Sequence, residues 1–252
     1  MRYLLLLYCS FRYITTKGWI GMNKYKHIIF DLDDTILDFQ DSEEKALKQI
    51  ITLYELPYNK QTIACYKRIN DGLWHQLEEG LISREEVLTT RFSLFLKEFH
   101  IDEKGEKVEA MYRELLNQGH KTVTYAHELL NALSKQDYNL YIGTNGVGKT
   151  QRKRLEGAKL QGYFEQLFIS EEIGYEKPNP QFFYYIFDAL HTSRKEEFLM
   201  IGDRLTSDIQ GAINVGIDCV WFNPKRSMPK SCSPKSTYTI PNLMQIMDLL
   251  GE

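Results

Sequence analysis

The sequence predicts an α/β fold, in which a parallel sheet forms the core and a helical unit is inserted after the first strand. Short apolar runs alternate with amphipathic stretches from about residue 25 onward, as in a sheet whose strands are joined by helices. Residues 39–117 break this alternation, because they contain no convincing strand. We therefore expect a Rossmann-like core domain from 22–38 and 118–252, and a helical cap domain from 39–117.

The expected strands are short apolar runs, each followed by Asp, Gly, Asn or Ser. They are 27–30, 139–142, 166–169, 198–201 and 219–222. Runs of this length between helices are typical of parallel strands that are covered on both faces. Because functional side chains of such sheets gather at the carboxyl ends of the strands, we expect the chemistry of this protein there.

The inserted stretch predicts helices near 42–55, 60–79, 83–99 and 103–117. The third has a clear start, since Ser83 can cap it and Glu86 occupies the capping-box position. The aromatic residues Phe39, Tyr66 and Trp74 are interpreted as core residues of the cap rather than as groups that stack on a ligand. His75 and Glu79 share a helix face, but the sequence offers no third ligand for a metal there.

Composition excludes several classes of function. The 252 residues carry a net charge of −3 without a basic block, so a nucleic acid polymer is not an expected partner, whereas a small anion is. The 4 cysteines (Cys9, Cys65, Cys219 and Cys232) form no CxxC pair, which argues against zinc and redox sites. Free thiols indicate the reducing cytoplasm. The sequence says nothing about the oligomeric state.

The first 21 residues are expected to lie outside the fold, as a non-native or disordered extension. Their apolar run, Leu4 to Leu7, is interrupted by Ser10 and Arg12 and is too short to span a membrane. Codons for 17–19 can form a purine-rich stretch before the codon of Met22. We therefore expect Met22 to be the true start, and we expect no association with a membrane.

Acidic residues follow two of the expected strands. Asp31 and Asp33 come directly after the first strand, and Asp203 follows the run 198–201, with Asp208 five residues later. Carboxylates beyond a buried strand are costly unless something binds them. A parallel sheet brings all of them to one edge, where oxygen ligands suit Mg²⁺. Asp208 could instead be a charge at a helix N-terminus, but its spacing favours support of the metal.

Groups able to bind phosphate lie between these acids in the sequence. Thr144 lies at the end of an expected strand, and the backbone amides after it lie at the start of a helix. These groups can therefore donate to phosphate oxygens. Lys177 can offset the negative charge of a nucleophile and a phosphate together. Asn145 either contacts the substrate or shapes the turn.

The order of these motifs resembles the haloacid dehalogenase (HAD) superfamily. DxDxT occupies 31–35, TNG 144–146, KP 177–178 and GDxxxxD 202–208, and the resemblance extends over about 25–250. The segments IIFDLDDTILDF, TNG with its following Gln, IGYEKPNPQFF and IGDRLTSDIQGA resemble the YjjG-type pyrimidine 5′-nucleotidases. The resemblance implies the HAD fold with a C1-type cap, and a phosphatase that acts on a small phosphorylated metabolite. It further implies a 5′-nucleotidase with pyrimidine mononucleotides as the expected substrates.

The family resemblance also implies a role for each motif residue. Asp31 attacks phosphorus and becomes the aspartyl phosphate, while Asp33 protonates the leaving oxygen and then activates water. Thr144 and Lys177 hold the phosphoryl oxygens. Mg²⁺ is held by Asp31, the backbone carbonyl of Asp33 and Asp203, with Asp208 in direct or water-mediated support. A sugar-phosphate phosphatase or a phosphomutase of the same fold would keep the same motifs and is the alternative.

A second motif competes for the phosphate-binding turn. Residues 143–150 match the P-loop pattern GxxxxGK[ST] after a strand and before a helix, which would make Lys149 essential in a nucleoside triphosphatase. That interpretation leaves Asp31, Asp33 and Lys177 without a role, so we favour the phosphatase. In the phosphatase, the basic residues of the helix are expected to form a solvated face; they are Lys149, Arg152, Lys153 and Arg154.

Overall fold

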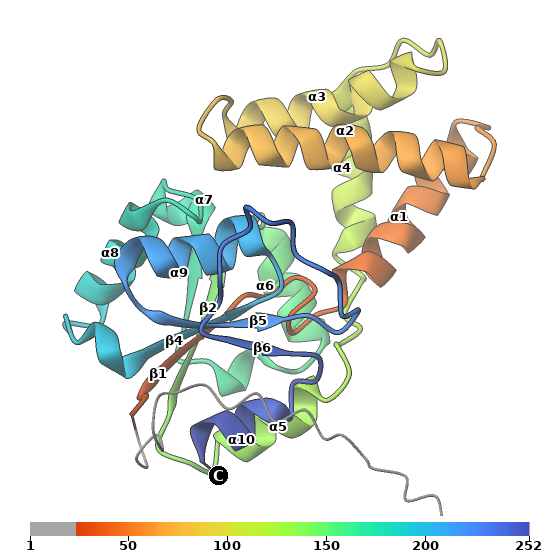
Figure 1. Ribbon diagram of the computed structural model, residues 1–252. Helices are drawn as coiled ribbons and strands as arrows, with labels where there is room; N and C mark the ends of the chain where they lie inside the picture. Colours follow the sequence, from red (N-terminus) through yellow and green to blue (C-terminus); the bar gives the residue numbers. More distant parts are fainter. Residues whose placement is uncertain (1–23, 252) are drawn as a thin grey trace, which may run out of the picture.

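The computed structural model describes residues 24–251, and its core is a six-stranded sheet in the order β3-β2-β1-β4-β5-β6 (Figure 1). All neighbouring strands are parallel. The strands are β1 (His27–Phe30), β2 (Asn139–Thr144), β3 (Gln166–Ile169), β4 (Phe198–Gly202), β5 (Asp218–Phe222) and β6 (Tyr238–Ile240). The expected extension at 1–21 and the expected start at Met22 lie outside the described residues.

Helices cover both faces of the sheet, which gives three layers (Figure 1). Successive residues of β1 point to opposite faces: Ile28 and Phe30 belong to one apolar cluster and Ile29 to the other. The first cluster includes residues of α5 (Ala126–Leu133), α6 (Gly148–Gly157) and α10 (Gln245–Leu250). The second includes residues of α8 (Pro180–Ala189) and α9 (Gln210–Val215), and the short α7 (Ser170–Ile173) follows β3. The predicted α/β, Rossmann-like fold class is confirmed.

A separate helical unit is inserted between β1 and α5. It consists of α1 (Phe39–Leu53), α2 (Lys60–Glu78), α3 (Arg84–Lys97) and α4 (Gly105–Leu116), close to the helices that the sequence predicts. Figure 1 shows these helices standing beyond one edge of the core. They have an apolar cluster of their own, in which Tyr66 is fully buried as expected. The capping box of Ser83 and Glu86 is present at the start of α3.

Two antiparallel segments connect the core to this unit. Leu37 forms a bridge with Thr122, and the Asp38 amide donates to the Lys121 carbonyl oxygen at 2.8 Å. The Asp38 carboxylate caps α1 through the Asp41 amide at 3.0 Å and pairs with the Lys121 ammonium at 2.7 Å. The two connections are therefore tied to one another where they leave the core.

The structure adds two elements that the sequence pattern does not reveal. β6 has only 3 residues and extends the sheet beyond β5. A π-helical turn (Leu205–Ile209) follows β4 and carries Asp208. Among residues 24–251, no helix combines the length and the apolar character that crossing a membrane requires.

Candidate active site

Three carboxylates meet at the carboxyl edge of the sheet. Phe30 of β1 is in register with Ile201 of β4, so Asp31 and Asp203 leave neighbouring strands almost together. Oxygen atoms of Asp31, Asp203 and Asp208 all lie within 4.8 Å of one another. Asp31 and Asp208 are buried. The expected acidic cluster is therefore formed by residues that are far apart in the sequence.

Lys177 lies inside this cluster and is 1% exposed. Its Nζ donates to Asp31 Oδ1 at 2.7 Å, to Asp208 Oδ1 at 2.6 Å and to the Gly143 carbonyl oxygen at 2.5 Å. Burial alone would lower the pKa of the Lys177 ammonium, but the Asp208 and Asp31 carboxylates outweigh burial and raise this pKa. Lys177 is therefore a fixed cation directly beside the candidate nucleophile.

Asn145 positions the backbone of this lysine. Its side-chain amide donates to the Lys177 carbonyl oxygen at 2.8 Å and accepts from the Lys177 amide at 2.9 Å. Both polar atoms of the Asn145 side chain are thus engaged with one peptide segment. Asn145 therefore shapes the site by holding the Lys177 backbone, and its contact with substrate stays a prediction.

The acidic cluster has more negative charge than Lys177 can balance. Burial, followed by the nearby Asp208, raises the pKa of Asp203 well above its usual range. Burial also raises the pKa of Asp31 to about 7, although Lys177 acts in the opposite direction. Asp203 Oδ1 is buried without a hydrogen-bond partner among the described residues. An unpartnered oxygen among converging carboxylates fits a small divalent cation such as Mg²⁺.

Mg²⁺ should raise the melting temperature of this protein, and by more at pH 8 than at pH 6. Between the unfolded value of 3.8 and the folded value of about 7, folded Asp31 keeps a proton that the unfolded chain has released. The free energy of unfolding without metal therefore falls as pH rises through this window. The cation binds ionised carboxylates and should offset this loss. Thermal unfolding in EDTA and in Mg²⁺ at both pH values measures the effect, and equal shifts at both would contradict it.

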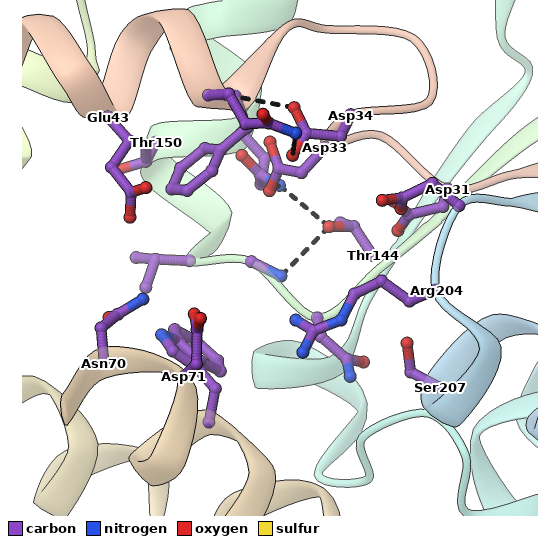
Figure 2. A pocket seen from close by; sticks show the side chains of 18 of the residues that line it. Asp31, Asp33, Asp34, Glu43, Asn70, Asp71, Thr144, Thr150, Arg204 and Ser207 are labelled. Atoms are coloured by element: carbon purple, nitrogen blue, oxygen red, sulfur yellow. Dashed lines mark hydrogen bonds between the residues drawn. The ribbon is translucent and has the colours of Figure 1, made fainter. Parts of the chain in front are cut away.

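Thr144 ends β2 and faces the same edge (Figure 2). Its hydroxyl oxygen accepts from the Gly146 amide at 3.1 Å and from Gln151 Nε2 at 2.9 Å. Both bonds use lone pairs of Thr144 Oγ1, so its hydroxyl hydrogen is available to a phosphoryl oxygen. Thr144 is therefore placed to donate to a phosphoryl oxygen, and its phosphate-binding role stays a prediction.

The same turn does not form a P-loop cradle. The Gly148 amide donates to the Glu171 carboxylate at 2.8 Å, and the Gly146 amide is taken by Thr144. Amides of the turn that would face phosphates in a P-loop are thus already paired within the protein. Lys149 is exposed, as expected for a residue on a solvated helix face.

Asp33 is held by the helix after this turn. One of its oxygens accepts from Gln151 Nε2 at 2.7 Å and the other from Arg154 Nη1. The prediction that Arg154 lies on a solvated helix face is wrong, because its side chain is 0% exposed. Arg152 and Lys153 are exposed, as predicted. The helical repeat explains the difference: Arg154 lies on the same face as Gln151, one turn further along, and this face points toward Asp33.

A cavity of about 500 Å³ lies between these core groups and the cap. Figure 2 shows Glu43, Asn70 and Asp71 of the cap opposite Asp31 and Thr144 of the core. Phe39 and Trp74 line the cavity as well. Their interpretation as cap core residues is therefore incomplete, since both are only partly buried and contribute to the cavity wall. Burial raises the pKa of the Glu43 carboxyl to about 7.

Arg84 connects the cap to the phosphate-binding turn. Its Nη1 donates to the Asn145 carbonyl oxygen at 2.7 Å, and its Nη2 donates to Ser170 Oγ at 2.5 Å and to Glu176 Oε1 at 3.0 Å. Its guanidinium also lies 5.8 Å from the centroid of the Trp74 ring. One cap side chain therefore fixes the position of α3 against the core segments that carry Thr144 and Lys177.

Arg84→Ala should lower kcat/KM by about tenfold while changing the melting temperature little. The lost bonds join two structural units, so the cap should enclose the cavity less often without unfolding of either unit. Arg68→Ala is the matched control, since Arg68 pairs at 3.5 Å with Glu98 inside the cap and is 65% exposed. Steady-state kinetics of both variants measure the effect; equal kinetics for the two would show that the Arg84 contacts do not support the active arrangement.

Comparison with known proteins identifies the family. A model of the haloacid dehalogenase-like hydrolases matches residues 28–222. This chain belongs to the haloacid dehalogenase-like hydrolase family. The HAD-hydrolase YfnB of Bacillus subtilis is 40% identical over 91% of this chain and 97% of its own length. A crystal structure of YfnB bound to magnesium superimposes with a TM-score of 0.85, covering 90% of this chain and 99% of that one.

Two further relatives of this HAD-type phosphatase are named after their substrate class. The pyrimidine 5′-nucleotidase PynA of Streptococcus pneumoniae is 37% identical over 90% of this chain and 96% of its own length. The pyrimidine 5′-nucleotidase YjjG of Escherichia coli is 30% identical over 90% of this chain and 98% of its own length. The resemblance to the YjjG-type group is thereby confirmed.

The motif residues that the sequence singles out converge in this HAD site, whereas His75 does not join them. His75 and Glu79 form an exposed i, i+4 pair at 3.5 Å, and the acidic cluster is the sole candidate metal group in the part of the chain that the structure describes. Sequence reasoning missed Arg84 and Arg154. Arg154 stands in a run of basic residues that predicts a solvated helix face, and nothing near Arg84 in the sequence indicates its contacts across to the core.

Proposed function

We propose that this protein is a Mg²⁺-dependent 5′-nucleotidase that hydrolyses pyrimidine mononucleotides through an aspartyl phosphate on Asp31. The observation that carries the proposal is the cluster of Asp31, Lys177, Asp203 and Asp208, with Lys177 Nζ 2.7 Å from Asp31 Oδ1. The names of the relatives PynA and YjjG support pyrimidine nucleotides as the substrate class.

In the first half of the reaction, Asp31 is the nucleophile. Its carboxylate attacks the phosphorus of the bound monoester, and the bond to the 5′ oxygen breaks. Lys177 and the Thr144 hydroxyl donate to the phosphoryl oxygens and stabilise the charge that develops on them. Asp33 donates a proton to the leaving oxygen, so the nucleoside departs as a neutral alcohol. Bound Mg²⁺, held by Asp31, Asp203 and Asp208 with the Asp33 backbone carbonyl, would supply further positive charge at the phosphoryl group.

In the second half, Asp33 acts in the opposite direction. Having lost its proton, it accepts one from a water molecule that attacks the aspartyl phosphate, which releases phosphate and restores Asp31. The cap limits access of other water while the phosphoryl group is on Asp31. Because 29% of the Asp33 side chain is exposed, this carboxylate can meet both the leaving group and water.

The cap unit selects the leaving group in this proposal. We place the cap domain at 39–117 and the core domain at 22–38 and 118–252, so that the cavity lies at their junction. A volume of about 500 Å³ suits a mononucleotide. Phe39 and Trp74 offer aromatic faces to a base, and the polar groups of Asn70 and Asp71 offer hydrogen bonds. The cytoplasm stays the predicted location.

A screen of phosphorylated metabolites, with Mg²⁺ and detection of released phosphate, tests the proposal. Pyrimidine 5′-mononucleotides should give the highest kcat/KM, and EDTA should abolish the activity. A preference for sugar phosphates by more than about tenfold would replace the nucleotidase with a sugar-phosphate phosphatase, since a tenfold preference corresponds to 1.4 kcal/mol of binding in the transition state. Full activity in EDTA would reject the dependence on metal.

A further inference from the structure

Arg154 carries a buried positive charge that has no role in the proposed steps of phosphoryl transfer. It is among the largest fully buried side chains of the described protein, and it lies on α6 beside the active site. Burial of a guanidinium is costly unless acceptors surround it, so its contacts indicate what it does.

Each contact of Arg154 joins it to the site or to the connections of the cap. Its Nη1 donates to Asp33 Oδ1 and to Gln151 Oε1, the latter at 3.1 Å. Its Nε donates to the Gly119 carbonyl oxygen at 2.9 Å. Its guanidinium carbon lies 5.2 Å from the centroid of the Phe39 ring.

Each carboxylate oxygen of Asp33 accepts a hydrogen bond from a side chain of α6. Arg154 holds one oxygen, and Gln151 Nε2 holds the other at 2.7 Å. The same Gln151 nitrogen donates to Thr144 Oγ1 at 2.9 Å, so one amide joins Asp33 to the phosphate-binding hydroxyl. The orientation of the Asp33 carboxyl is therefore set by two side chains of one helix.

Arg154 also contacts both connections between core and cap. Phe39 is the first residue of α1, and Gly119 lies shortly after the end of α4. The two connections pack so closely that a Cβ on Gly119 would collide with the Ser42 side chain of α1. A movement of the cap that shifts these connections must therefore also shift the groups that fix Arg154.

We propose that Arg154, together with Gln151, is the positioning residue of the Asp33 acid/base and joins the orientation of Asp33 to the position of the cap. The inference rests on the proposed role of Asp33 and adds to it. Arg154 contributes no bond to the substrate. It holds the Asp33 carboxyl at the angle from which the proton passes to the leaving oxygen when the cap encloses the cavity.

The dependence of the rate on the leaving group separates this role from a purely structural one. A nucleoside leaves as an alkoxide unless it is protonated, whereas p-nitrophenolate leaves without a proton. General acid catalysis typically contributes 10² to 10⁴ in rate, and the first substrate alone needs it. A variant that misplaces Asp33 should therefore lose kcat/KM on the nucleotide and retain it on p-nitrophenyl phosphate.

The experiment compares kcat/KM of Arg154→Met on uridine 5′-monophosphate and on p-nitrophenyl phosphate. On the nucleotide we expect a loss of about 10², which is the lower end of the effect of a general acid. On the aryl ester we expect a loss of less than about fivefold. Arg152→Met is the matched control, since Arg152 lies on the same helix, is half-exposed and pairs with Glu172. It should change neither value. Equal losses on both substrates in Arg154→Met would overturn the inference.

Asp33→Asn serves as the reference and separates two kinds of failure. If Asp33→Asn shows no selective loss, the proposed role of Asp33 falls and the inference with it. If Asp33→Asn is selective and Arg154→Met is not, the inference alone falls. In the double variant, Arg154→Met should add less than about threefold on the nucleotide, because both changes remove one function; independent losses that multiply would overturn it.

A conservative variant covers the case in which Arg154→Met does not fold. Arg154→Lys keeps the charge, but an ammonium cannot reach Asp33 Oδ1 and the Gly119 carbonyl oxygen with the fixed fork of a guanidinium. We expect the same selectivity with a smaller loss. A loss that is equal on the two substrates would again overturn the inference.

Discussion

Asp31→Asn should abolish turnover while leaving the fold intact. A carboxamide is a very poor nucleophile toward phosphorus and a weak ligand for Mg²⁺, so we expect a loss of at least about 10⁵ in kcat, since covalent catalysis and metal binding fail together. The variant should fold, because Lys177 keeps its bonds to Asp208 at 2.6 Å and to the Gly143 carbonyl oxygen at 2.5 Å. Phosphate release in single-turnover and steady-state assays measures the loss.

A matched control is Asp188→Asn, which makes the same chemical change on the exposed surface of α8. It should alter kcat by less than about twofold, as surface substitutions usually do. Activity of Asp31→Asn within about tenfold of the wild type would reject Asp31 as the nucleophile. A beryllofluoride soak should also place the adduct on Asp31 of the wild-type protein, and an adduct on Asp33 would reverse the two assignments.

The sequence predicts the sheet and the meeting of the motif acids at its edge, because both follow from local patterns. Each strand except β6 is a short apolar run between helices. Asp31 directly follows β1, and Asp203 directly follows β4. Once the sheet is parallel, strand register alone brings Asp31 and Asp203 together. No long-range information beyond the alternation of elements was needed for this part of the site.

Features that depend on packing between distant elements were not predictable in the same way. β6 has 3 residues and too little periodicity to distinguish it from a loop. Arg154 was misplaced because a run of basic residues usually faces solvent, whereas here the Asp33 carboxylate and the Gly119 carbonyl oxygen give one of them buried acceptors. Arg84 reaches the Asn145 carbonyl oxygen only because the cap lies over that turn. Charge patterns therefore predict which helix faces meet solvent, whereas a charged residue that is buried, such as Arg154, is identified only by its tertiary contacts.

Lys177→Ala and Lys149→Ala should have opposite consequences in the two interpretations of the phosphate-binding turn. As a phosphatase, the protein should lose about 10² or more in kcat/KM with Lys177→Ala, the scale for removal of a group aimed at charge in the transition state. Lys149→Ala should change hydrolysis by less than about threefold, because Lys149 is exposed. A P-loop enzyme would show the reverse order, since its lysine contacts the β- and γ-phosphates.

Stability provides a second measurement on the same pair. Removal of Lys177 leaves the buried Asp31 and Asp208 carboxylates without their cation, which typically costs about 3–5 kcal/mol of unfolding free energy. Mg²⁺ should recover part of this loss, since it can bind the released carboxylates, whereas Lys149→Ala should unfold like the wild type. If Lys177→Ala is too unstable to assay, Lys177→Arg keeps the charge but should still reduce turnover, because a guanidinium does not fit the position of a single ammonium. Damage by Lys149→Ala, or ATP hydrolysis far above that of monophosphates, would reject Asp31 as the nucleophile along with the phosphatase site.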